Sequence, residues 1–340
     1  MSEPALPSDI SRLTGIPDFS PLRLDHLRVL RISGADASSF LQGQLTCDVG
    51  ALRPAAATLG AWCSAKGRAL VSFLLTTDGQ DFRMVLPAEL ADAVKERLTM
   101  FVLRAKVRID ADEEVAFGLV GAAGAAPAVP VPLPGPWPQA VWERSAHDGV
   151  QWIRMPDAAG LARWLALVTP QQAAGLAGPA SAAGAGAALW RWLEIRAGLP
   201  MVLAATQDKF VPQMINLEAL DAVSFRKGCY PGQEVVARSQ YLGKLKRRTF
   251  LAHAAPAGTG DVPGAPVAPG GDVFDAAGNP VGTVVNIEAA PGAAAGFDLL
   301  VEVPVEAAAH PLFLAGSVAL TQLELPYPLP DNEVFVRPKL

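Results

Sequence analysis

Apolar and polar positions alternate in short segments over the first 120 residues, as they do in half-buried strands, and residues 27–33 show this most clearly. Further short apolar segments end at turn signals such as Lys66-Gly67, and we expect strands at 57–63, 68–77, 82–86, 105–110 and 115–120. Residues 34–45 and 88–101 have the spacing of amphipathic helices. Strands mixed with two helices and hairpin-length loops predict the α+β class rather than a doubly wound parallel sheet.

The second half of the chain changes pattern at about residue 246. Before it, we expect a strand at 150–155 and helices at 158–168 and 189–197, between Ala/Pro/Gly-rich linkers at 121–138 and 171–188. After it, short strands separated by Gly/Pro-rich turns predict a small all-β barrel, with strands at 247–253, 281–288, 297–304 and 317–324. The expected domains are an N-terminal α+β domain, a second α+β domain and a β-barrel, at 20–120, 140–245 and 246–335.

Composition places the chain among globular proteins with ample core material. The 340 residues are 51% hydrophobic and 18% charged, and the formal net charge is −5. An acidic balance does not favour nucleic acid as a direct ligand. One basic cluster breaks the pattern, and we interpret it as a solvated strand start, with an anion or RNA contact as the alternative: Lys244, Lys246, Arg247 and Arg248.

The N-terminal residues and the cysteines favour a cytoplasmic protein. Residues 1–10 lack the basic region and apolar run of a signal peptide, and no apolar stretch is long enough to span a bilayer. The three cysteines form no C-x-x-C pair, which favours reduced thiols. Neither they nor the four histidines have metal-ligand spacing, so we expect no metal site.

The densest set of reactive side chains lies at residues 227–238, Lys-Gly-Cys-Tyr-Pro-Gly-Gln-Glu-Val-Val-Ala-Arg. We expect a helix from Gln233 onward, with Pro231 tolerated in its first turn. Cys229 would then lie just outside the helix N-terminus, where the dipole and the charge of Lys227 favour a thiolate. Glu234 and Arg238 have the spacing of an i,i+4 ion pair.

Each of these residues also has a purely structural interpretation. A lone cysteine is more often a small buried apolar residue than a nucleophile. Glu234 and Arg238 could form only a surface pair, and Tyr230 could only cover a core. Their clustering, rather than any single residue, favours a functional site.

Several segments together resemble one family. The Lys-Gly-Cys-Tyr-x-Gly-Gln-Glu motif is present at 227–234, and supporting stretches occur at 34–49, 63–68, 210–217 and 325–327. The sequence resembles the folate-binding YgfZ-type proteins, relatives of the glycine-cleavage T-protein, an aminomethyltransferase. The resemblance covers nearly all of the chain outside the low-complexity tracts.

The resemblance implies three domains in a ring around a central folate site, the last a β-barrel. It implies tetrahydrofolate or a related folate as cofactor, iron–sulfur client or assembly proteins as partners, and a role in iron–sulfur protein assembly, maintenance or repair that can affect tRNA modification. The implied catalytic residues are Cys229, Lys227 and Tyr230. The implied folate-binding residues are Trp190, Asn216, Gln233 and Glu234. For Trp190 core packing is the alternative, and the family's other tryptophan corresponds to Leu27.

Two other functions stay open. T-proteins carry an Asp after the Gly of the turn that corresponds to Lys66-Gly67, but residues 68–72 here contain no carboxylate. This weakens, without excluding, a folate-dependent aminomethyl or methyl transferase or demethylase. A non-catalytic folate-sensing scaffold, with residues 227–238 as a docking surface, is the third possibility. Whether the protein is an enzyme is not decided by the sequence.

Overall fold

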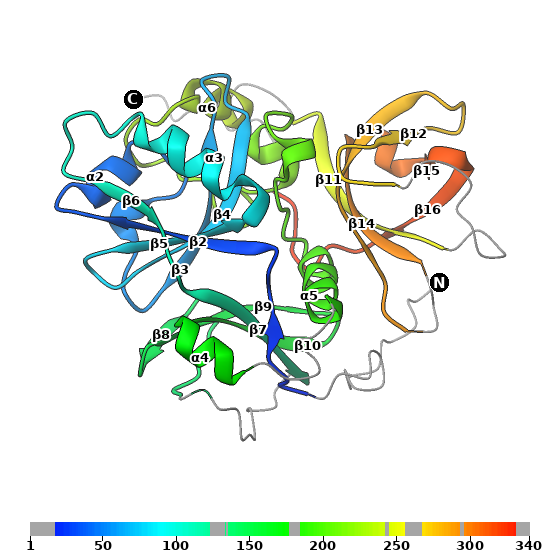
Figure 1. Cartoon of the computed structure of the whole chain (residues 1–340). Helices are drawn as coiled ribbons and strands as arrows, with labels where there is room; N and C mark the ends of the chain where they lie inside the picture. The colour runs from blue at the N-terminus through cyan, green and yellow to red at the C-terminus, as the bar shows by residue number, and fades with distance from the viewer. Residues whose placement is uncertain are drawn as a thin grey trace.

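The computed structural model describes residues 18–122, 133, 135–176, 184–241, 245–255, 267–292 and 296–330. These residues form two five-stranded sheets and a closed six-stranded barrel, all with antiparallel pairing (Figure 1). The α+β class and the C-terminal barrel are therefore confirmed. Much of the predicted linkers, at 123–132 and 177–183, and Lys244 of the basic cluster lie outside the described residues.

The first sheet follows the predicted strands closely. Its order is β3-β4-β5-β2-β6, with bounds β2 Leu27–Ser33, β3 Ala57–Cys63, β4 Ala69–Thr77, β5 Phe82–Pro87 and β6 Arg108–Ala111. Helix α3, Ala88–Thr99, buries Leu90, Val94 and Leu98 in the core of this sheet. Helix α2 is shorter than expected, Ala37–Gln42, and is followed by the 3-10 helix η1, Val49–Ala51.

The second sheet draws strands from both halves of the chain. Its order is β1-β7-β10-β9-β8, with bounds β1 Leu22–Arg23, β7 Val115–Ala122, β8 Arg144–His147, β9 Val150–Ala158 and β10 Leu161–Val168. The predicted helix at 158–168 is wrong, because that segment is the central strand β10. The predicted domain boundaries stay a prediction. Strands β1 and β7 belong to the second sheet, although most of their residues fall within the predicted first domain, 20–120. Helix α4, Pro170–Gly175, follows β10.

The barrel closes in the order β11-β14-β13-β12-β15-β16. Its bounds are β11 Arg247–Ala254, β12 Asp272–Phe274, β13 Pro280–Ala289, β14 Phe297–Pro304, β15 Leu312–Leu314 and β16 Val318–Leu323, with 3-10 helices η5 Ala307–Ala309 and η6 Ala315–Ser317. Arg247 pairs with Glu302, and Arg248 is a buried partner of Glu218 at 2.6 Å. The two arginines of the basic cluster are thus paired, Arg248 is not a solvated residue, and Lys246 is exposed.

Helix α5, Ala185–Arg196, joins the second sheet to the barrel at the centre of the molecule (Figure 1). The Trp192 indole donates a hydrogen bond of 2.7 Å to Asp298 of β14, and His253 of β11 lies 2.7 Å from the same carboxylate. After α5 the chain forms 3-10 helices η3, Ala204–Thr206, and η4, Pro212–Ile215, and then α6, Gln233–Tyr241. The prediction of a helix from Gln233 onward is therefore confirmed, and this helix is α6.

Candidate functional site

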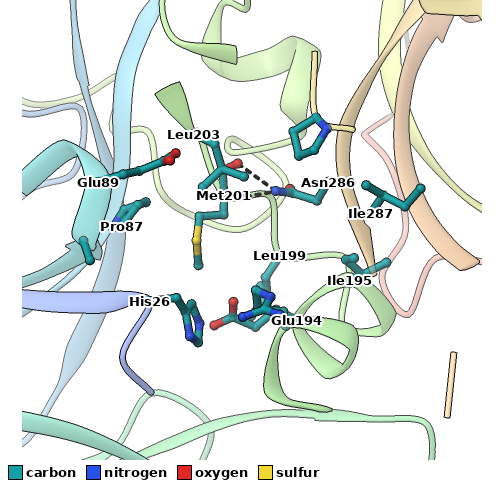
Figure 2. A pocket seen from close by; sticks show the side chains of 13 residues that line it. His26, Pro87, Glu89, Glu194, Ile195, Leu199, Met201, Leu203, Asn286 and Ile287 are labelled. Carbon is teal, nitrogen blue, oxygen red and sulfur yellow. Dashed lines mark hydrogen bonds between the residues drawn. The ribbon is translucent and has the colours of Figure 1, made fainter. Parts of the chain in front are cut away.

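A cavity of about 330 Å³ opens where the first sheet, α5 and the barrel meet. We call it the central cavity. It is lined by the residue before β2, the start of α3, one face of α5, the 199–203 loop and β13 (Figure 2). Its walls are mainly apolar, with a few polar side chains, which is the usual character of a small-molecule site. The polar lining residues are His26, Glu89, Arg191, Glu194 and Asn286.

A smaller space of about 60 Å³, the inner cavity, continues from the central cavity. The two share Pro87, Glu194, Leu199 and Met201 in their walls. Leu27, which the resemblance aligned with a tryptophan, lines the inner cavity. Since nearly all of its other lining side chains are apolar, Glu194 is the charged group that both spaces present to a ligand.

Burial controls the chemistry of Glu194. The Trp190 indole donates a hydrogen bond of 3.0 Å to one Glu194 oxygen, and the Arg163 guanidinium lies 5.1 Å from the centre of the Trp190 ring. Removal from water raises the pKa of Glu194 to about 7, against the opposing charge of Arg163. The same burial lowers the pKa of Arg163 to about 10. Glu194 is therefore divided between its protonated and ionised forms at neutral pH.

Trp190, one of the expected folate contacts, is fully buried. A Cβ added at Gly118 of β7 would lie 2.3 Å from its ring, so the strand packs directly against the indole. Trp190 lines neither cavity. A direct folate contact by Trp190 stays a prediction, whereas its hydrogen bond to Glu194 gives it an indirect place in the site.

Asn216, the second expected folate contact, is also fully buried. It takes a left-handed conformation with φ of 57° at the end of η4. Its amide donates to the Thr249 carbonyl of β11 at 2.8 Å and accepts from Arg248 at 3.3 Å. These contacts attach the 212–218 segment to the barrel, and the folate role of Asn216 stays a prediction.

The 227–238 segment places its thiol at the surface and its phenol inside. Cys229 is exposed, whereas Cys47 and Cys63 are buried. The Lys227 ammonium donates to the carbonyls of Leu45 and Cys47, at 2.6 and 2.9 Å, and lies 5.3 Å from the centre of the Tyr230 ring. Tyr230 is buried, its hydroxyl has no hydrogen-bond partner among the described residues, and burial raises its pKa.

The remaining members of the segment form and support the start of α6. The Gln233 side chain accepts a hydrogen bond of 3.3 Å from the Tyr230 backbone, which caps the turn before the helix. Glu234 and Arg238 form the predicted i,i+4 ion pair at 2.7 Å, and both are exposed. Neither Gln233 nor Glu234 lines the central or the inner cavity, so their folate roles also stay predictions.

The expected place of Pro231 in the first helical turn is wrong. Gly232 adopts φ of +77°, which ends any helical path before it, and α6 therefore begins at Gln233. The effect of this helix N-terminus on the Cys229 thiol stays a prediction. A Cβ at Gly232 would lie 2.4 Å from the Ser64 carbonyl and 2.5 Å from Gly67. The close contact of two glycines thus fixes the 227–238 segment against the 64–67 turn of the first sheet.

The chain therefore carries two separate candidate sites, a buried cavity and an exposed thiol loop. Sequence patterns pointed to the loop and missed Glu194 and His26 of the cavity. Glu194 had one local signal, a carboxylate four residues after a tryptophan in a mainly apolar helix. His26 had none, because its neighbours in the cavity come from distant segments.

Comparison with solved structures identifies the fold. The glycine cleavage system aminomethyltransferase T from Bartonella henselae superposes with a TM-score of 0.67 over 90% of this chain and 85% of that chain, at 19% identity. The chain thus has the T-protein-like fold, as expected. No family model matches the sequence.

Sequence comparison then gives the family. The chain is 33% identical over 250 residues to the tRNA-modifying protein YgfZ of Colwellia psychrerythraea, covering 70% of this chain and 72% of that protein. It is 34% identical over 248 residues to the protein of the same name from Edwardsiella ictaluri, covering 67% and 69%. The chain belongs to the YgfZ family, as the 227–234 motif predicted. Among the described helices, none has the length and apolar character needed to cross a bilayer.

Proposed function

We propose that this protein binds tetrahydrofolate or a related folate in the central cavity and presents Cys229 to partner proteins. In this proposal it acts in the cytoplasm in the assembly, maintenance or repair of iron–sulfur proteins, and affects tRNA modification through them. The single observation that supports it most is the central cavity itself, with Glu194 at its junction with the inner cavity.

The chemistry of the cavity supports a flat heterocycle that carries N–H groups on one edge. The pterin ring of folate has apolar faces and adjacent N–H donors, and an ionised carboxylate accepts from two such donors at once. A volume of about 330 Å³ lies in the range of small-molecule sites. Apolar walls such as Leu199 and Met201 would cover the ring faces.

Calorimetry with tetrahydrofolate and folic acid tests the folate site. We expect the wild type to bind and Glu194→Gln to bind at least tenfold more weakly, since an amide is a neutral and weaker acceptor. Glu234→Gln is the matched control, because it changes an exposed carboxylate outside the cavity. Equal loss in both variants, or no binding by the wild type, would contradict the proposed site.

The thiol is tested separately in a strain that lacks its own family protein. Cys229 is the exposed cysteine of the described chain, so Cys229→Ala should leave the fold intact and fail to restore activity of iron–sulfur enzymes. Full rescue by Cys229→Ala would remove the essential thiol from the proposal. Rescue by Cys229→Ser but not by bulky changes at Gly232 would favour the scaffold function instead.

A folate-dependent one-carbon transferase or demethylase is the second candidate, and Glu194 favours it. A carboxyl group whose pKa lies near 7 can take up and release a proton at the operating pH. Turnover of methylene- or methyl-tetrahydrofolate by the purified protein, abolished in Glu194→Gln, would support this function. A folate that binds without turnover across candidate amines would support the first proposal.

A further inference from the structure

An exposed apolar loop connects helix α3 to strand β6. We call residues 100–106 the apolar loop, because three of its large apolar side chains are exposed: Met100, Phe101 and Leu103. Leu103 is 89% exposed and Met100 67%. Single exposed apolar residues are ordinary on a protein surface, but three within four positions mark a candidate interaction surface.

The backbone of the apolar loop is held in place, although these side chains are exposed. Val102 packs against the core of the first sheet. The Lys106 N–H donates to the Asp36 carboxylate at 2.7 Å, and the Lys106 carbonyl accepts from the Asp36 N–H at 3.3 Å. The loop therefore presents its side chains in one arrangement, which lowers the conformational entropy lost on binding.

Leu103 has a backbone conformation that disfavours leucine. Its φ is 46°, in the left-handed region where Gly, Asn and Asp are the usual residues. Because the side chain is almost fully exposed, burial within the chain does not offset this strain. A strained residue whose side chain contributes little to the core is typical of a functional position.

Positive charge borders the apolar loop in a chain whose net charge is −5. Arg104 and Lys106 are exposed, and Glu96 is the one acidic residue in 93–109. Arg108 is paired within β6 at 2.8 Å, whereas Arg104 and Lys106 form no ion pair with any residue that the structure describes. A partner that matches this surface offers an apolar groove with carboxylates along its rim.

The apolar loop lies at the same end of the first sheet as the exposed thiol of Cys229. The Phe101 ring packs edge-on against Trp62 of β3, with 6.1 Å between the ring centres. Trp62 forms a backbone bridge with Leu45, and the Leu45 carbonyl accepts from the Lys227 ammonium at 2.6 Å. Two residues thus link the apolar loop to Lys227, which precedes Cys229 by two positions.

We propose that the apolar loop is the docking surface for the partner proteins to which Cys229 is presented. Met100 and Leu103 enter an apolar groove of the partner, and Arg104 and Lys106 contact acidic residues at its rim. The inference rests on the proposed function and adds to it the surface used and the chemistry of the partner. An anionic bilayer would match the same side chains, but it would bring no protein group to the thiol.

Leu103→Asp tests the docking surface in a strain that lacks its own family protein. Asp adopts the left-handed conformation more readily than Leu, so the melting temperature should equal or exceed that of wild type. Tetrahydrofolate affinity should not change, because the apolar loop lines neither cavity. Recovery of iron–sulfur enzyme activity should fall at least tenfold. Val141→Asp, which adds the same charge at an exposed apolar position before β8, is the matched control and should restore activity fully.

Arg104→Glu keeps the apolar side chains, reverses one charge of the border and should lower the recovery severalfold. Wild-type recovery by Leu103→Asp or by Arg104→Glu would overturn the inference, as would equal loss in Val141→Asp. A clear fall in the melting temperature of Leu103→Asp would also overturn it, because Leu103 would then support the fold. These results leave the proposed function standing, whereas a wild type that restores no activity overturns both.

Photo-crosslinking in growing cells identifies the class of the occupant. A photo-reactive amino acid in place of Leu103 should crosslink acidic iron–sulfur proteins that the same group in place of Val141 does not. The same crosslinks at both positions would contradict the docking surface. Vesicles that contain phosphatidylglycerol, and bulk tRNA, serve as further probes of the purified protein. Binding to either probe that is lost in Leu103→Asp would assign the apolar loop to a membrane or to RNA and overturn the inference.

Discussion

The ionisation of Glu194 predicts how ligand binding depends on pH. Burial raises its pKa from 4.5 to about 7, so about a tenth of the groups are ionised at pH 6 and about nine tenths at pH 8. If the ionised form accepts hydrogen bonds from the ligand, affinity should rise about tenfold between pH 6 and pH 8. Calorimetry at the two pH values measures this, and Glu194→Gln should show no such rise.

The same shift predicts the stability of the ligand-free protein. The folded state retains a proton on Glu194 that the unfolded chain releases at pH near 4.5. The contribution of Glu194 to the free energy of unfolding should therefore fall as the pH rises from about 4.5 to about 7, and level off above. Urea denaturation of wild type and Glu194→Gln across this range isolates the contribution. A difference that is independent of pH would contradict the raised pKa.

Tyr230 gives a third prediction at the scale of single residues. Its hydroxyl is buried with no hydrogen-bond partner among the described residues, and the Lys227 ammonium contacts the face of the ring rather than the oxygen. Tyr230→Phe should keep both packing and the cation–π contact, so the free energy of unfolding should be unchanged or rise by up to about 1 kcal/mol. If the stable variant fails to complement, the phenol itself takes part in function. Complementation at the wild-type level would remove Tyr230 from the catalytic group.

Local spacing allowed some of these residues to be predicted and hid others. The Glu234–Arg238 pair follows from helical periodicity alone and is confirmed. Glu194 and His26 lie in a cavity whose walls come from several segments, including the 199–203 loop and β13 of the barrel. A pattern that repeats every three or four residues carries no information about such long-range desolvation.

Among the connecting elements, the contact between the 64–67 turn and the 227–238 segment sets the position of the thiol. Gly232→Ala would place a Cβ 2.4 Å from the Ser64 carbonyl and strain a left-handed backbone. We expect a loss of about 2 kcal/mol or more in the free energy of unfolding. The alkylation rate of Cys229 should also change, since the loop must move.

Gly228→Ala is the matched control for that substitution. A Cβ at Gly228 would meet no atom within 4 Å. Stability and Cys229 alkylation should both stay close to wild type in this variant. If the two alanine variants behave alike, the glycine contact does not hold the loop in place.

Strand β10 shows why one element was assigned to the wrong type. Its sequence, Leu161–Val168, is apolar almost throughout, and every residue of it is buried. A strand covered on both faces loses the polar alternation that marks a strand, and Leu and Ala also favour helices. Pairing with β7 and β9 on its two sides decides the outcome, and no local pattern encodes it. The strands of the first sheet were predictable because turns such as Lys66-Gly67 mark where they end.

At the scale of the whole molecule, the central cavity exists because three separate parts of the fold meet there. α3 starts at one wall, α5 forms another, and β13 of the barrel supplies a third. Polar contacts hold these walls together, notably Asn286 with the Met201 backbone and Trp192 with Asp298. Sequence patterns predicted α3, α5 and the barrel separately. The cavity between them forms only when these elements pack against one another, and no local pattern encodes that packing. The site is therefore a property of the assembled chain.

A ligand in such a cavity should stabilise the chain across all of its walls. At a free concentration one hundred times Kd, binding to the folded state adds about 2.7 kcal/mol to the free energy of unfolding. We expect tetrahydrofolate to raise the melting temperature and to slow amide hydrogen exchange at the start of α3, in the 199–203 loop and in β13. The 227–238 segment lines neither cavity, so its exchange should change little. Hydrogen-exchange mass spectrometry with and without ligand measures both regions. Protection confined to the 227–238 segment would move the folate site from the central cavity to the thiol loop.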